Sequence, residues 1–495
     1  MTFALLLTGC GCLDQSANLP GEPLPTLPEV VGANDVTRGP EQPLREISIA
    51  FTGEVRGEIE PCGCPTLPYG GFARRQTLLT RVGAELGRDI VHVDLGEALR
   101  KGLVTLEGDV VRDRGELILE LMVLSGVEVY VPGPTDLATV GEEGLKESGL
   151  TVISATWAAF PATTVVEREG LRLGFIGFSG APAGEDGPDL EAVAAAAVTE
   201  LRAQNVDLII GLSNLSDVQG RQVAAVEGIG LVLSTKGSTH DAPSNVSGTA
   251  YLESPDRGRY VEFAHLQLRS TPEVSTVVLK DFTDAFVQYD ESRRGRHRTG
   301  RVEPDEAELR LGAELEELGR GRNLVALEER PLGSELDNSP SAVSGRLDDW
   351  RADRMTHARE AVQSTPVEFS ARYATASKCA SCHPSQFARY GFTSHRNAGR
   401  TLISAGRQDE PECLACHTTG FGQPGGFADT DKETLRTFGG VQCESCHGPL
   451  AGHPRHAEAV PAQVDEQTCL ACHDEANSPN FDYDQYLLEV ICPVD

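Results

Sequence analysis

Basic residues are scarce in this sequence, and long apolar runs are missing from it. Lysine and arginine number 43 against 74 aspartates and glutamates, which gives a formal net charge of −31. Such a charge repels phosphate backbones and argues against a nucleic-acid partner. It is consistent with a basic protein partner or with a role in solubility alone. No segment is apolar enough to span a bilayer, so any membrane attachment is expected to use a lipid.

Cysteine is absent from most of the chain, between Cys64 and Cys379. The thirteen cysteines are instead bunched: two near the start, the close pair Cys62 and Cys64, four further pairs, and Cys492. A disulfide framework would spread cysteines through the fold. Bunching of this kind favours cofactor attachment.

The four later pairs all belong to C-x-x-C-H motifs. They are Cys379-Ala380-Ser381-Cys382-His383, Cys413-Leu414-Ala415-Cys416-His417, Cys443-Glu444-Ser445-Cys446-His447 and Cys469-Leu470-Ala471-Cys472-His473. In this signature two cysteines bind the vinyl groups of one porphyrin, and the following histidine meets the iron. Zinc sites also use paired cysteines, but they do not require a histidine after every second one. The sequence therefore predicts four covalently bound haems c.

Residues 373–495 are expected to form a mostly helical and irregular multihaem domain. Its segments between motifs are short and rich in glycine, proline and polar residues. A domain so small has few apolar side chains to bury, so the porphyrins would supply the missing core. We expect this domain not to fold without haem.

The same residues resemble the cytochrome c-554 family of tetrahaem proteins. The matching stretches are the four motifs, Ser394-His395-Arg396-Asn397-Ala398, and Gly440 to Pro449 followed by His453. The resemblance implies that His395 and His453 bind haem irons from the far side, with His456 as the alternative to His453. The family has a further histidine beyond the fourth motif, and none follows His473 here. One or two haems are then expected to be five-coordinate, unless His456 or His357 binds them.

The first ten residues resemble a bacterial lipoprotein signal. A short apolar run, Phe3 to Leu7, precedes Leu7-Thr8-Gly9-Cys10, which resembles a lipobox with Cys10 as the lipidated residue. The basic start of a signal peptide is missing. Residues 11–44, rich in proline, glycine and polar residues, are expected to form a flexible tether. Together these features predict a lipid-anchored protein in the periplasm, the outer membrane or at the cell surface.

Residues 45–283 alternate strand-like and helical segments, which predicts an α/β fold of sheets covered by helices. The expected strands are Ile47–Phe51, Ile90–Val93, Val127–Val131, Leu171–Phe178, Val206–Leu212, Leu231–Ser234, Val261–Leu268 and Ser275–Leu279. Arg114–Leu124 and Leu190–Ala203 are expected helices. Residues 284–372 are predicted to be a charged helical linker, in which Arg293–Arg301 is loop-like and Pro304–Gly319 and Gly345–Gln363 are helical.

The order of these strands resembles the metallophosphoesterase domain of the 5′-nucleotidase family. The matching segments are Thr52 to Pro61, Gly70 to Arg74, Asp94 to Glu97, Gly133 to Asp136, Leu212 to Leu215 and Leu233 to His240. Most metal ligands of the family are replaced at these positions. The replacements are Glu54-Val55-Arg56, Glu97, Pro134, Thr135, Asn214, Lys236 and Ser238, and with a gap His240 stands in for one lost histidine. An arginine would bring fixed positive charge into a cation site, so we expect this domain to have lost its metals.

Cys62 and Cys64 lie in the loop where that site would open. A C-x-C pair does not attach haem in the usual way. Several alternatives stay open: a strained, reducible disulfide, a pair of thiolates for a soft metal such as copper, a structural disulfide, or pairing with Cys12 or Cys492.

The sequence favours an extracytoplasmic tetrahaem cytochrome that exchanges electrons with redox partner proteins and is not itself an enzyme. The first alternative is a redox enzyme that acts on a small nitrogen or oxygen species at an open haem. The second is a 5′-nucleotidase-type hydrolase with an appended cytochrome, which the replaced ligands disfavour.

Overall fold

The computed structural model describes residues 45–61, 69–100, 109–182, 184, 186–235, 243–255, 257–268, 276–277, 280–318, 323–337, 340–364, 372–405, 408, 411–429, 431–473, 478 and 480–490. All four C-x-x-C-H motifs are among them. The predicted signal and tether, Cys10, Cys12, Cys62, Cys64, Lys236, Ser238, His240 and Cys492 lie outside the described residues.

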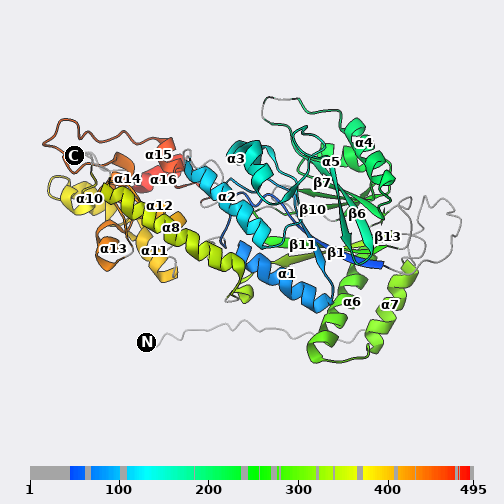
Figure 1. Cartoon of the computed structure of the whole chain (residues 1–495). Coiled ribbons are helices and arrows are strands. Elements are labelled where there is room, and N and C mark those ends of the chain that lie inside the picture. Colours follow the sequence, from blue (N-terminus) through cyan, green and yellow to red (C-terminus); the bar gives the residue numbers. More distant parts are fainter. Residues whose placement is uncertain are drawn as a thin grey trace, which may run out of the picture. The chain divides into compact units, whose positions relative to one another are not determined.

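The N-terminal part is built on two sheets, the first of which has seven strands (Figure 1). In sheet order these are β12 (Thr276–Val277), β13 (Asn323–Pro331), β11 (Tyr260–Leu268), β1 (Arg45–Thr52), β2 (Ile90–Asp94), β3 (Val129–Tyr130) and β4 (Thr151–Val152). From β1 to β4 the strands are parallel, whereas β11 is antiparallel to both β1 and β13.

The second sheet has six strands and is parallel at its centre. Its order is β5 (Thr163–Arg168), β6 (Leu171–Phe178), β7 (Leu208–Ser213), β8 (Leu231–Thr235), β10 (Thr249–Ser254) and β9 (Ser244–Val246). Antiparallel strands close both edges.

The main core lies between the two sheets. Alternate residues of β1 (Ile47, Ile49 and Phe51) are fully buried in one cluster with residues of β6, β7 and β8. Ala50, which points to the other face of β1, packs against α1 instead. This alternation follows from the two-residue period of a strand.

Helices cover the outer face of each sheet. On the first sheet these are α1 (Phe72–Leu86), α2 (Asp109–Leu124) and α3 (Pro134–Glu147). On the second they are α4 (Leu190–Ala203) and α5 (Asp217–Ala224). The predicted α/β class is confirmed, with helix, sheet, sheet and helix as successive layers.

Residues 284–372 are not simply a linker. They supply most of α6 (Lys280–Thr299), together with α7 (Glu306–Leu318), β13, the 3₁₀ turn η1 (Ser334–Leu336) and α8 (Ala342–Ser364). β13 pairs with β11 along almost its whole length, so the first sheet needs this segment. The loop expected at Arg293–Arg301 is wrong up to Thr299, because α6 continues to that residue.

The C-terminal part consists of short helices joined by irregular segments, as predicted. They are α9 (Ala376–Cys379), α10 (Pro384–Tyr390), η3 (Ser394–Asn397), α11 (Ala398–Ala405), α12 (Pro411–His417), α13 (Lys432–Phe438), α14 (Cys443–His447), α15 (Glu466–Leu470) and α16 (Tyr483–Val490). Its apolar core is a small cluster around Leu402, Leu414 and Phe427, to which α8 adds Met355. Within the described residues, no helix combines the length and apolarity that a bilayer crossing requires.

Candidate haem-attachment site

Each C-x-x-C-H motif forms one helical turn that brings its first cysteine and its histidine together. The backbone N–H of His383 donates to the carbonyl of Cys379 over 2.8 Å, and His473 donates to Cys469 over 2.9 Å. The second motif forms the last five residues of α12, and the third motif makes up the whole of α14. Residues four apart lie on one face of a helix, so each motif presents cysteine and imidazole to the same side.

Four candidate ligand imidazoles are held through their Nδ1 atoms. Nδ1 lies 2.9 Å from the Ala398 carbonyl in His417 and 3.2 Å from the Ala462 carbonyl in His447. In His453 it lies 3.1 Å from the Ala459 carbonyl, and in His473 it lies 3.0 Å from Ser478 Oγ. A carbonyl accepts only from a protonated Nδ1, which leaves Nε2 with its lone pair free for a metal.

Two pairs of histidines face each other. The rings of His383 and His453 are stacked with centroids 6.5 Å apart, and those of His395 and His473 have centroids 6.0 Å apart. Two imidazoles on opposite sides of one metal ion, with bonds of about 2 Å to nitrogens about 1.2 Å from each centroid, would stand roughly 6.3 Å apart. Both pairs therefore have the spacing of a bis-histidine site.

His395 is prepared for this arrangement by its surroundings. Burial lowers the pKa of His395, and the facing His473 lowers it further, which favours the neutral imidazole that iron requires. His473 is itself packed face to face with Phe481, at a centroid distance of 4.6 Å.

The other candidate histidines are not paired in this way among the described residues. No ring contact joins His417 or His447 to a second imidazole there. His456, the alternative ligand, lies half exposed with Nδ1 3.3 Å from Glu458 Oε1. His357 is exposed on α8.

The first and third motifs adjoin one another. A hydrogen bond with Cys443 lowers the pKa of the Cys379 thiol to about 7. The sulfurs of Cys379 and Cys443 are therefore close together. Porphyrins attached to the first and third motifs would lie near each other.

Two side chains that the sequence analysis did not single out tie these motifs together. Glu444, in the third motif, is buried and accepts from the backbone N–H groups of Ala374 and Leu450 over 2.8 and 2.7 Å. Burial raises the pKa of Glu444. Gln442 accepts from the backbone N–H of Ala376 over 2.7 Å. Glu444 occupies a variable position of its motif, so no sequence signal marked it.

The residues around the motifs fit haem. Large apolar side chains are exposed in the segments that follow the third and fourth motifs, among them Val460 at 70% and Leu488 at 69%. With the oriented imidazoles and the small protein core, these segments leave apolar side chains that bound haem would cover.

The strand ends of the N-terminal part bring together the positions that resemble a phosphoesterase site. Glu54, Arg56 and Glu97 all have left-handed φ values, of 48°, 49° and 54°. Arg56 forms an ion pair with Glu54 over 2.6 Å, and Glu97 accepts from the Thr135 hydroxyl. Strained non-glycine residues of this kind cluster at functional sites, but here each of these side chains has a protein partner.

Buried acids nearby are used to hold loops. Asp136 accepts from the backbone N–H groups of Glu97, Ala98, Leu99 and Gly133 over 2.7–2.8 Å. Asn214 donates to the carbonyls of two strand-end residues. Across the described part of the chain, no three His, Cys, Asp or Glu side chains are grouped to hold a metal ion.

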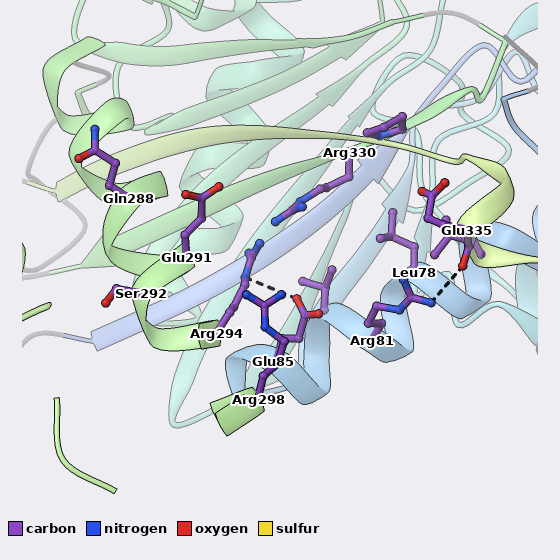
Figure 2. Close-up of a pocket in the computed structure, with 13 residues that line it drawn as sticks. Leu78, Arg81, Glu85, Gln288, Glu291, Ser292, Arg294, Arg298, Arg330 and Glu335 are labelled. Carbon is purple, nitrogen blue, oxygen red and sulfur yellow. Dashed lines mark hydrogen bonds and ion pairs between the residues drawn. The ribbon is translucent and has the colours of Figure 1, made fainter. Parts of the chain in front are cut away.

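A cavity of about 760 Å³ has none of the predicted site residues in its lining. Figure 2 shows the side chains that line it. Its walls come from α1, α6 and the segment 330–336. Arg294 is buried at its floor, where both terminal nitrogens bond the carboxylate of Glu328 over 2.8–2.9 Å. Four arginines and three glutamates line it, so it has no strong charge preference.

Comparison with known proteins supports the resemblance of the C-terminal part. Residues 378–448 match the family described as "Cytochrome c554 and c-prime". The match spans the first three motifs and ends before the fourth. Cytochrome c-554 of Nitrosomonas europaea is 33% identical over 87 residues, and the match covers 14% of this chain and 36% of that protein. The chain thus spans about a third of the length of this relative. A c-type cytochrome family implies covalently bound haem c.

Solved structures resemble the N-terminal part more weakly. A 5′-nucleotidase precursor from Thermus thermophilus has a TM-score of 0.45 at 17% identity, covering 64% of this chain and 61% of that one. A sulfate thiohydrolase from Thermus thermophilus has a TM-score of 0.43 at 17% identity, and the match covers 63% of this chain and 61% of that one. The NAD nucleotidase of Haemophilus influenzae has a TM-score of 0.42 at 14% identity, and the match covers 65% of this chain and 69% of that one. A likeness of this degree says nothing about metals or substrates.

Proposed function

We propose that this chain is an extracytoplasmic tetrahaem c-type cytochrome that transfers electrons between redox partner proteins. The observation that carries the proposal is the pair of facing imidazoles, His383 with His453 and His395 with His473, whose spacings fit one metal ion each. Each pair joins a motif histidine to a histidine that the family resemblance marks as a far-side ligand.

The roles of the residues follow from their positions. The eight motif cysteines would attach the porphyrins, and His383, His417, His447 and His473 would bind the irons. His395 and His453 would complete two bis-histidine sites. When bound, haem c supplies an iron that gains and loses one electron. A closed bis-histidine site favours outer-sphere electron transfer, because it leaves no position for a substrate.

A second function, reduction of a small nitrogen or oxygen species, is favoured by one observation. His417 and His447 face no second imidazole among the described residues, although their Nδ1 atoms are held. A haem bound on one side only would leave an iron position for a small ligand.

The setting of the protein is part of the proposal. Lipidation of Cys10 would anchor it by a flexible segment to a membrane outside the cytoplasm, where haem c attachment takes place. The acidic composition, at −31, supports the absence of a nucleic-acid partner.

The experiment that tests this function is a haem count on the purified protein. Pyridine haemochrome spectra and intact mass are expected to give four haems c per chain, and EPR is expected to show at least two low-spin bis-histidine irons. A protein matured in a haem c-competent host that carries no covalent haem would refute the proposal. Nitric oxide titration of the reduced protein separates the two functions, because only an open haem binds it.

A further inference from the structure

The segment that contains the first motif has a charge opposite to that of the whole chain. Between residues 372 and 408 the sequence holds no acid and six bases: Arg372, Lys378, Arg389, Arg396, Arg400 and Arg407. From residue 409 to the end it holds sixteen acids and three bases. The net charge of −31 therefore conceals one strongly basic region.

Five of these bases stand on the surface. Arg372, Lys378, Arg389, Arg396 and Arg400 are all exposed, and we call them the first-motif surface. Arg389 donates to the Leu488 carbonyl over 3.0 Å, and Arg396 lies 6.0 Å from the Tyr390 ring centroid. None of the five forms an ion pair with a described residue. Their charge is thus not neutralised by the part of the protein that the structure describes.

The same segment contains the most exposed attachment point. Of the eight motif cysteines, Cys382 alone is exposed, and the others are partly covered. Phe392, exposed at 89%, lies between Arg389 and Arg396 in the sequence and offers an apolar contact. An exposed attachment point, an apolar side chain and several bases unpaired among the described residues are features of one segment that suit a transient electron-transfer interface.

We propose that the first-motif surface docks an acidic redox protein, which exchanges electrons with the haem held by Cys379, Cys382 and His383. This inference rests on the proposed function. A compact acidic protein fits better than a membrane or a nucleic acid, because the acids beyond residue 408 would repel an extended anionic surface. A small partner can contact the basic region alone. Salt screens its repulsion by acids that lie more than about 8 Å away.

The reaction moves one electron and no atoms. The reduced partner loses one electron, and the ferric iron gains it and becomes ferrous. No bond forms or breaks. The basic residues act only by raising the rate of encounter and orienting the partner.

The test uses the haem-loaded full chain with reduced flavodoxin, an acidic one-electron donor, followed by stopped-flow absorbance. The variant is Lys378→Glu with Arg400→Glu, which spares Arg389 and its bond to Leu488. The matched control is Arg112→Glu with Lys146→Glu, which makes the same change of charge at exposed positions of α2 and α3. The methyl viologen radical cation, a small cationic donor, reports whether the haems remain reducible.

At low ionic strength, we expect the test variant to lower the bimolecular rate with flavodoxin by about tenfold or more, and the control variant by less than about twofold. At high salt the difference should vanish, and the viologen rate should not fall. Calorimetric binding of oxidised flavodoxin should weaken in parallel, which is a readout independent of electron transfer.

Any of four results would overturn the proposal. Equal slowing by both variants would show a mere effect of net charge. Slowing at every salt concentration with altered haem potentials would show that the bases pair with haem propionates instead. Normal flavodoxin rates, with loss of binding to phosphatidylglycerol vesicles, would assign the surface to a membrane. A protein without haem would refute the proposed function itself, whereas a haem-loaded protein indifferent to the variants refutes only the docking surface.

Discussion

At the scale of single residues, the facing imidazoles make His453 the clearest test of iron ligation. His453→Ala removes the ring opposite His383, and no described imidazole stands ready to replace it. We expect one haem per protein to change from low to high spin, because a five-coordinate histidine-bound iron has a weaker ligand field. EPR and the visible spectrum of the ferric protein measure the change.

His456→Ala is the matched control, since His456 lies only three residues away but its Nδ1 is paired with Glu458. It should leave the spin state unaltered. If instead His456→Ala produced the high-spin haem and His453→Ala did not, the alternative ligand would be the true one, and the facing pair would be packing alone.

The sequence marked the histidines of these pairs as candidate ligands but did not predict their orientation. His395 and His453 were identified because they follow the motifs at positions where the cytochrome c-554 family has far-side histidines. Backbone carbonyls hold Nδ1 in two of the motif histidines: that of Ala398 in His417 and that of Ala462 in His447. Every residue type has such a carbonyl. Only the folded path of the chain brings them near, so no residue pattern announces them.

At the scale of elements, the pairing of β11 with β13 places two glutamates side by side. Glu262 lies directly opposite Glu329, and its side chain is buried. Burial raises the pKa of Glu262 well above its usual range, and the charges of Glu329 and Glu328 raise it further. The folded protein thus holds a proton at Glu262 that the unfolded chain releases at lower pH.

This proton makes the stability of the N-terminal part depend on pH. Below the ordinary glutamate pKa both states are protonated, and Glu262 has no effect on stability. Above it only the unfolded state ionises, so the free energy of unfolding should fall with rising pH, by up to about 1.4 kcal/mol per pH unit, until the folded pKa is passed. We expect Glu262→Gln to remove this slope and to stabilise the protein at pH 8 but not at pH 4.

Urea unfolding followed by far-UV circular dichroism at pH 4 to 8 measures the slope. Glu314→Gln, at an exposed position of α7, is the control and should leave the slope as in the natural protein. A Glu262→Gln protein with the natural slope would mean that another group takes up the proton.

Charge explains which elements the sequence could predict. The strands of the core, such as β1 and β6, are apolar and were found close to their true bounds. β13 and α6 were missed because each carries charged residues that are typical of loops and linkers. In the structure these charges meet each other: Arg294 of α6 bonds Glu328 of β13, and Arg293 bonds Glu46 of β1. Partners so distant in the sequence have no local signature.

At the scale of the whole molecule, α8 belongs to two cores. Val343 and Leu347, near its start, are buried with residues of α2 beside the first sheet. Met355, two turns further along, is buried with Leu402, Leu414 and Phe427 of the C-terminal part. A segment predicted as a solvated connector therefore supplies apolar side chains to both parts, and its charged composition hid this role.

The small size of the cytochrome core makes Met355 the decisive position of α8. Removing a buried side chain of this size costs about 2–5 kcal/mol, and few other apolar contacts are present to absorb the loss. We expect Met355→Ala to lower the stability of the haem-bearing part by about that amount, seen as earlier unfolding in the Soret band. Leu347→Ala should act instead on the far-UV transition of the sheet domain.

Arg359→Ala separates packing from charge at the same helix. Arg359 bonds Asp429 through two nitrogens over 2.9 and 3.0 Å, but both side chains are about 40% exposed. An exposed ion pair contributes about 0–1 kcal/mol, so this variant should nearly match the natural protein. If Arg359→Ala moved the Soret transition as far as Met355→Ala, the contact of α8 with the haem-bearing part would be held by charge. A silent Met355→Ala would show that the porphyrins alone carry that core.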